Sequence, residues 1–154
     1  MPDKREAILV RLEEIVAAVD GFVTTGRNHS DLEDTDLPAL VVIDGDEDAA
    51  DTDEGGAKQP GLRPRIMVMR PVISAVLLGL REANGPKAQE LRARLVNAVA
   101  TDTELQTLCL NKRMSYEGLK SLPSKGARGD IYGMSLAFTF TYVFRPQDLG
   151  PGSS

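Results

Sequence analysis

The chain has 154 residues, of which 42% are hydrophobic and 27% are charged, a composition typical of one globular domain rather than of a disordered chain. The formal net charge is −5, but seven of the 23 acidic residues lie within positions 44–56, and the remaining 16 nearly balance the 18 basic residues. This near balance gives no indication of a broad basic surface for nucleic acid. A single cysteine excludes an intrachain disulfide, and no apolar run is long enough to cross a membrane, so we expect no membrane partner.

The first predicted element is a helix that begins after Asp3 and ends before Gly21. Asp3 and Glu6 have the spacing of an N-terminal capping pair, and glycine is common just past a helix end. Four apolar residues recur at helical spacing and predict the buried face, namely Ile8, Leu12, Ile15 and Val19. Two strands are predicted next, at 22–28 and 37–44.

Residues 44–56, with the sequence DGDEDAADTDEGG, place seven carboxylates in one short stretch. The nearest metal-binding pattern is the calcium loop of EF-hands, but Ala49 stands where that loop needs glycine, and Gly55 stands where it needs glutamate. The β-branched apolar run before the stretch predicts a strand, whereas an EF-hand loop follows a helix. We therefore expect no metal here and predict a solvated, mobile acidic loop between two strands.

The middle of the chain is predicted to pass from strand to helix. Residues 65–80 form the third predicted strand, in which Pro71 lacks a ladder donor and marks a bulge or an edge position. A helix is predicted from Asn84 to about Ala100, because Asn-Gly-Pro is a plausible helix start and apolar residues follow at helical spacing.

A second, shorter helix is predicted immediately afterwards. Thr101 and Glu104 have the spacing of a capping box. A strand at 113–122 and a turn-rich loop at 123–129 are predicted to follow.

The last predicted element is a strand from Ile131 to Arg145 with strict period-two alternation. Large side chains occupy the even positions, namely Tyr132, Met134, Leu136, Phe138, Phe140, Tyr142 and Phe144, while most odd positions are small or polar. Such a strand spans roughly 45 Å, more than the two predicted helices would cover. We therefore expect part of its apolar face, including Phe140, Tyr142 and Phe144, to lie at an interface with another subunit.

These elements predict an α+β fold, with a mostly antiparallel sheet of four to five strands and two main helices packed on one face. Residues 1–146 are expected to form one domain, with the acidic loop inserted between strands, and residues 147–154 a flexible C-terminal tail.

Catalytic and cofactor patterns do not occur in the sequence. The only histidine, His29, has no cysteine near it in sequence, and no phosphate-binding loop, hydrolase elbow or zinc pattern is present. Lys125 and Arg128 are two cations set among glycines that could contact phosphate, but such a segment is more often an ordinary mobile loop. We therefore expect a protein that is not an enzyme and uses no cofactor.

Several segments together resemble the tail terminator, or tail completion, proteins of long-tailed bacteriophages and gene transfer agents. They are REAILVRLEEI, a strand ending in GRN, DLPALVVIDGDE, MRPVI, LRARLVNAV, SYEG and FTFTYVFRP, and they span about residues 5–146. The resemblance lies in element order and loose signatures, and it transfers no individual functional residue. It implies a structural subunit that assembles as a ring, usually of six, on the finished tail tube and offers a surface to the head.

The implied partners are other copies of the chain, the tail tube protein, the head–tail connector or stopper protein, and DNA that passes through the ring without specific binding. The protein would occupy the host bacterial cytoplasm during assembly and then the head–tail junction of the particle. The acidic residues Asp46, Glu47, Asp48, Asp51, Asp53 and Glu54 have three interpretations, which are a solvated loop, a docking site for a basic patch, and a channel lining that repels phosphate.

Three other functions compete with the terminator. A head-closure protein of the neck would also be a multimeric ring. A small nucleic-acid-binding module would use Lys125 and Arg128. A ligand-binding α+β domain would use the acidic loop as a lid.

Overall fold

The computed structural model describes residues 3–29, 32–50, 64–79, 81–126 and 129–145. These residues form three α-helices, seven strands and two short 3-10 turns. In chain order they are α1 (Lys4–Ala17), β1 (Thr24–Arg27), η1 (Asp34–Asp36), β2 (Ala39–Ile43), β3 (Glu47–Ala49), β4 (Arg65–Met69), β5 (Val72–Gly79), α2 (Arg81–Ala100), α3 (Thr103–Leu108), η2 (Leu110–Lys112), β6 (Met114–Gly126) and β7 (Gly129–Phe144). The C-terminal tail predicted at 147–154 lies outside the described residues.

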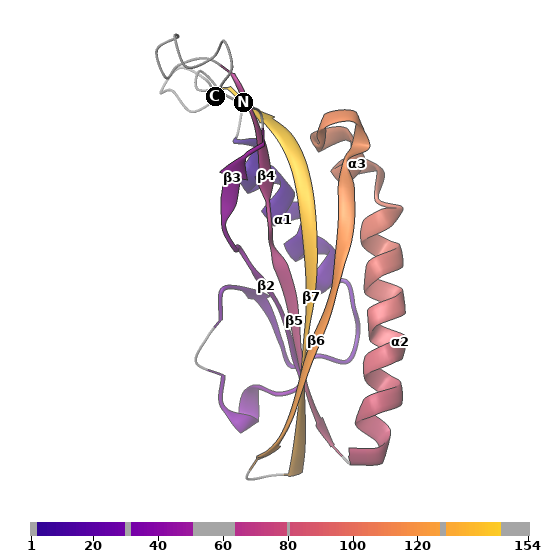
Figure 1. Ribbon diagram of the computed structural model, residues 1–154. Coiled ribbons are helices and arrows are strands. Elements are labelled where there is room, and N and C mark those ends of the chain that lie inside the picture. The colour runs from indigo at the N-terminus through magenta and orange to yellow at the C-terminus, as the bar shows by residue number, and fades with distance from the viewer. Residues whose placement is uncertain (1–2, 30–31, 51–63, 80, 127–128, 146–154) are drawn as a thin grey trace.

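All seven strands belong to one sheet, in which β7 is the central strand (Figure 1). On one side of β7 lie β5 and β4, which pair with different parts of it. Beyond them, β2 pairs with β5, β3 pairs with β4, and β1 pairs with β2. On the other side of β7 lies β6. Only the β1–β2 pair is parallel. The fold is therefore α+β with a mostly antiparallel sheet, as the sequence predicted.

The sheet has more strands than the predicted four to five because two long strands are each broken once. The predicted strand at 65–80 is divided at Arg70–Pro71 into β4 and β5, which pair with successive parts of β7. Likewise β3 continues the line of β2, because β2 pairs with β5 and β3 pairs with β4. The break at Pro71 falls where the missing ladder donor predicted an irregularity, and its carbonyl accepts from Phe138 N at 3.1 Å.

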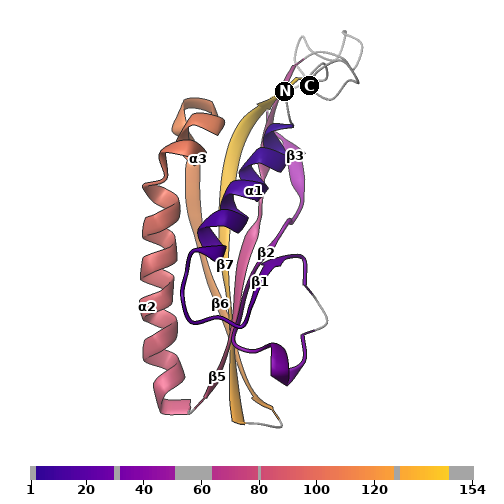
Figure 2. The ribbon, with the colours of Figure 1, turned by 180° about the vertical axis from the view of Figure 1, so that it is seen from behind.

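The helices cover one face of the sheet, and the other face carries no helix among the described residues (Figures 1 and 2). The buried side chains of α1, α2 and α3 form one cluster with the large even-numbered residues of β7. The buried face of α1 consists of Ile8, Leu9, Leu12 and Val16. Ile8 and Leu12 were predicted, whereas Leu9 and Val16 were not. The predicted Ile15 and Val19 are only partly buried and pack at the margin of the cluster.

The helices cover more of β7 than the sequence predicted. Helix α2 has 20 residues, because it begins at Arg81 rather than at Asn84, and α1 covers the part of β7 that α2 does not reach. Phe140 and Tyr142, which we expected at a subunit interface, are 0% and 1% exposed and lie in the core of the subunit. That expectation was wrong for these two residues because they pack in one cluster with the apolar face of α1, and the Tyr142 hydroxyl donates to Glu47 of β3.

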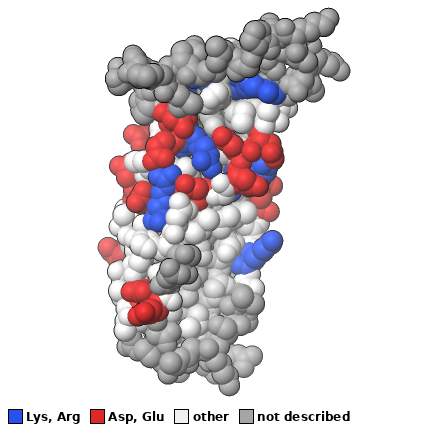
Figure 3. All heavy atoms as spheres, turned by 90° about the vertical axis from the view of Figure 1, so that its left-hand side faces the viewer, with Lys and Arg blue, Asp and Glu red and all other residues white. Residues whose placement is uncertain are grey.

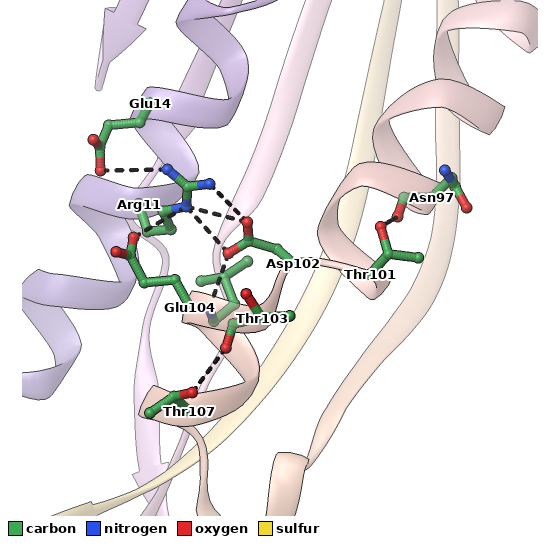
Figure 4. A network of polar contacts seen from close by, with 9 residues as sticks. Arg11, Glu14, Asn97, Thr101, Asp102, Thr103, Glu104 and Thr107 are labelled. Atoms are coloured by element: carbon green, nitrogen blue, oxygen red, sulfur yellow. Dashed lines mark hydrogen bonds and ion pairs between the residues drawn. The ribbon is translucent and has the colours of Figure 1, made fainter.

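An ion-pair network joins α1 to α3 (Figure 4). Asp102, rather than the predicted Thr101, caps α3 by accepting from Leu105 N at 2.9 Å, and the Thr101 hydroxyl instead donates to Asn97 O at the end of α2. Asp102 also accepts from the Arg11 guanidinium at 2.7 Å, and Glu104 lies 3.1 Å from Arg11 Nε. The Asp102 carboxylate thus caps the start of α3 and also fixes α3 against α1.

The hairpin of β6 and β7 is longer than predicted. The loop expected at 123–129 is shorter because β6 continues to Gly126, paired with Gly129. A bulge interrupts β6 between Tyr116 and Gly118, where Gly118 has φ of +130°.

Candidate functional site

The described part of the acidic stretch is a sheet edge rather than a loop. Glu47–Ala49 forms β3, paired antiparallel with β4, so the predicted solvated loop is wrong for this part. We call Asp44, Asp46, Glu47 and Asp48 the acidic edge. Asp51, Asp53 and Glu54 lie outside the described residues.

Gly45 makes the bend between β2 and β3 possible. Its φ is +70°, and a Cβ at this position would lie 2.0 Å from the carbonyl oxygen of Arg70. The bend at Gly45 and the strand break at Arg70–Pro71 thus pack backbone against backbone. Between them, Arg70 N donates to Asp46 O at 2.9 Å. A side chain at position 45 would push the acidic edge away from β4.

Arg27 anchors the beginning of the acidic edge. Its guanidinium donates to Asp44 at 2.6 and 3.0 Å and to Glu6 of α1 at 2.6 and 2.9 Å. These hydrogen bonds lower the pKa of both carboxyl groups and raise the pKa of Arg27. The predicted capping role of Glu6 is therefore wrong, because its side chain reaches β1 while Asp3 alone caps α1 through Arg5 N.

Glu47 connects the acidic edge to the core. The hydroxyl of the buried Tyr142 donates to Glu47 at 2.5 Å, and Arg5 Nε lies 3.6 Å from the same carboxylate. Burial and this hydrogen bond both raise the pKa of Tyr142. Arg5 also donates to Gly45 O at 2.8 Å, so α1 holds both the bend and β3.

The outward side chains of the acidic edge remain accessible. Asp48 pairs with Arg70 at 2.9 Å, but 72% of its side chain is exposed, and Asp46 has no ion pair among the described residues. Figure 3 shows the acidic side chains crowded around basic ones in one half of this face, whereas much of the remaining described surface is uncharged. The described part of the acidic edge therefore exposes carboxylates from a paired strand rather than from a loop.

The other predicted contact residues are dispersed. Lys125 lies near the end of β6, paired with Asp130, at the end of the sheet far from the acidic edge, and Arg128 lies outside the described residues. Phe144, at the end of β7, is half-buried beside the core cluster. The structure therefore does not bring the predicted residues into one site.

The sequence analysis missed a second candidate surface at the start of β6. We call residues 112–116 the basic edge, because Lys112 and Arg113 are exposed there and have no ion pair among the described residues. Asn111 and Lys112 both adopt positive φ, at 51° and 57°. Such backbone angles are uncommon for residues other than glycine, and this turn sets where Lys112 and Arg113 lie at the start of β6. The only sequence signal is the Lys-Arg pair before the strand.

A mainly apolar groove lies beside the basic edge, between α2 and β6. One hollow of about 190 Å³ and a neighbouring one of about 340 Å³ share Val96, Ala100 and Tyr116. Arg92 closes the groove by donating to the Tyr116 hydroxyl at 3.0 Å while its guanidinium carbon lies 5.4 Å from the ring centre. The groove therefore has apolar walls with cations at its ends.

A larger hollow of about 600 Å³ lies between α2, β5 and the segment before β1. Its walls are mainly apolar, and its rim carries Lys87, Glu90 and Arg94. Asn84 lines it and is 2% exposed, and its Oδ1 has no hydrogen-bond partner among the described residues. The described lining contains no serine, cysteine or histidine, so it offers no nucleophile with a base.

The reactive side chains noted in the sequence are also separated. His29 is exposed after β1, whereas Cys109 is buried after α3, and burial raises the pKa of its thiol to about 11. Over the ranges that the structure describes, no three acidic, histidine or cysteine side chains gather to hold a metal ion.

None of the helices in the described ranges is both long and apolar enough to cross a membrane. Comparison with protein-family models and with curated proteins gave no match.

Proposed function

We propose that this chain is a structural ring subunit that terminates a phage-type tail tube. Its partners would be other copies of itself, the tail tube protein and the head–tail connector or stopper, and DNA would pass through the ring without specific binding. The ring would form in the host bacterial cytoplasm and remain at the head–tail junction of the particle. The sequence resemblance described above is the starting point of this proposal.

One structural observation carries the proposal further. The sheet ends in two dissimilar edges on opposite sides of the subunit, one with fixed carboxylates on β3 and one with exposed cations before β6. A subunit with two different, complementary surfaces associates head to tail, and head-to-tail association closes into a ring when the rotation between copies allows it. A ring subunit also needs surfaces for the tube and the head, but no active site.

The distribution of helices supports the same function. All three helices pack on one sheet face, so the opposite face is left for contacts within a larger assembly. Its β7 side chains are small or polar, such as Ser135, Ala137 and Thr139.

Electron microscopy of particles made without this protein tests the proposal. We expect overlong tails, because nothing would stop the tube from growing. Tails of normal length that are detached from heads would instead identify a head-closure protein of the neck. Particles with normal, attached tails would contradict both ring functions, and salt-sensitive retention of the purified protein on DNA would then favour a nucleic-acid-binding module.

A further inference from the structure

We propose that the acidic edge of one copy pairs with the basic edge of the next, so that β3 extends the sheet of its neighbour at β6. The inference rests on the proposed function, because it names the contact that would close the ring. It is carried by four properties of the two edges: their level in the sheet, the direction of their backbone groups, their strand direction and their charge.

The two edges lie at the same level of the sheet. Glu47 pairs with Met69, Met69 pairs with Phe140, and Phe140 pairs with Met114. This row crosses the sheet from the middle of the acidic edge to the middle of the basic edge. A second copy placed beside the first at this level would therefore bring β3 against the start of β6 without a large shift along the strands.

Both edges direct backbone donors and acceptors outward. Arg70 N donates to Asp46 O, and Ala50 N donates to Ile66 O, so the alternate residues Glu47 and Ala49 point away from β4. On β6, Thr141 N donates to Arg113 O. By the same alternation, the backbone groups of Met114 and Tyr116 point away from β7. Each edge thus has two residues with outward backbone groups, and at this level Glu47 of one copy meets Met114 of the next.

The strand directions and register are also compatible. β3 is antiparallel to β4, β4 is antiparallel to β7, and β6 is antiparallel to β7, so β3 and β6 run in opposite directions. Continuing the row joins Met114 to Glu47 of the neighbouring copy as an antiparallel, hydrogen-bonded pair. Arg113 then faces Asp48 of the neighbouring copy, which gives the contact an ion pair.

Charge and strand breaks restrict the edges to this pairing. Two acidic edges would place carboxylates opposite one another, and two basic edges would repel in the same way. The Gly45 bend limits β3 at its start, and the bulge between Tyr116 and Gly118 ends the basic edge, so each edge has only about three residues to pair. Because each contact is short, a closed ring holds together through many such contacts rather than through one strong one.

A charge-reversal experiment tests the pairing. Arg113→Glu and Asp48→Lys each place like charges across the proposed contact, and we expect each variant alone to assemble about tenfold more weakly than the natural protein, or worse. An equal mixture of the two should assemble again, because every contact between alternating copies then joins one acidic and one basic side chain. Sedimentation up to about 1 mM protein would detect even weak association.

The controls separate this contact from a general effect of charge. Arg94→Glu and Asp20→Lys make the same charge changes at exposed positions outside both edges, so their assembly should equal that of the natural protein. Ala49→Pro removes one outward N–H next to the Glu47–Met114 pair but leaves the bond from Ala50 to β4, so it should weaken assembly without unfolding the subunit. Circular dichroism checks the fold of every variant.

The outcomes distinguish this inference from the proposed function. Charge variants that assemble normally, or a mixture that fails to recover, overturn the edge contact, and overlong tails in the particle experiment would still support a terminator. Recovery by the mixture, together with particles whose tails have normal length, supports the edge contact and rejects the terminator. The edge contact is also contradicted if the natural protein stays monomeric and the double variant with Arg113→Cys and Asp48→Cys forms no cross-linked multimers.

Discussion

The hydroxyl of Tyr142 donates a hydrogen bond of 2.5 Å to Glu47, and so the core of the domain holds its acidic edge in place. Tyr142 is 1% exposed, whereas Glu47 is partly open to solvent, and the bond therefore crosses from the interior to the surface. Position on a defined sheet edge, rather than charge alone, distinguishes Glu47 and Asp48 from an ordinary solvated acidic loop.

Tyr142→Phe should lower the free energy of unfolding by about 1.5 kcal/mol, since a hydrogen bond to a charged group is lost while the ring remains packed. Urea unfolding followed by circular dichroism measures this loss. Tyr132→Phe is the matched control, because the Tyr132 hydroxyl has no hydrogen bond to another described residue, and its effect should be close to zero. Equal effects of the two substitutions would show that the bond to Glu47 contributes nothing to stability.

Gly45→Ala should destabilise the fold by roughly 2 kcal/mol or more, because the added Cβ meets the Arg70 carbonyl at 2.0 Å and the residue must keep a positive φ. Gly21→Ala is the control for φ alone. Gly21 has φ of +96° with no atom within 4 Å of its Cβ position, and its substitution should cost about 1 kcal/mol. Thermal unfolding of both variants gives the difference, and a Gly45→Ala protein as stable as Gly21→Ala would disprove the close backbone contact.

Acid should weaken the fold through the carboxyl groups held by arginine. The pKa of Asp102 is lowered first by the hydrogen bond from Arg11, and that of Asp44 first by the hydrogen bond from Arg27. The folded state therefore binds these protons less readily than the unfolded state. The stabilisation is fully present above the ordinary aspartate pKa of 3.8 and is lost as the pH falls through the lowered values.

Asp102→Asn isolates one of these groups. Asparagine still caps α3, so the variant should lose the charge-assisted bond to Arg11 and show a shallower decline in stability with acid. Glu14→Gln serves as the control, because Glu14 lies 3.9 Å from Arg11 with 57% of its side chain exposed. Urea unfolding across the acid range would contradict the assignment if both variants followed the natural protein.

Phe138→Ser and Phe144→Ser should have different consequences although both change the same face of β7. Phe138 is 2% exposed, and its ring centre lies 5.5 Å from that of Tyr116 and 6.2 Å from that of Phe140. Removing it should cost about 3–5 kcal/mol and unfold the subunit. Phe144 is half-buried at the strand end, so its variant should keep the fold and lose assembly. Circular dichroism and sedimentation separate the two results. Unfolding of both variants, or normal assembly of both, would rule out separate roles.

Local patterns in the sequence determined much of the framework. The period-two alternation of residues 131–145 predicted the central strand and its buried face, because neighbouring side chains of a strand point to opposite sides. Asp3 predicted the start of α1, because a side-chain acceptor at that position satisfies a free backbone donor. Such features depend on residues a few positions apart, and the sequence states those distances directly.

Only the tertiary structure decided what the acidic residues do and which aromatic residues remain accessible. Asp44, Asp48 and Asp102 pair with arginines 17, 22 and 91 residues away, and the row from Glu47 to Met114 depends on three strand registers. Phe140 and Tyr142 are buried because they pack in one cluster with the apolar face of α1, although their sequence pattern is the same as that of Phe144. A one-residue change of register would move every side chain of a strand to the other face, so these contacts follow from the packed sheet and not from sequence spacing.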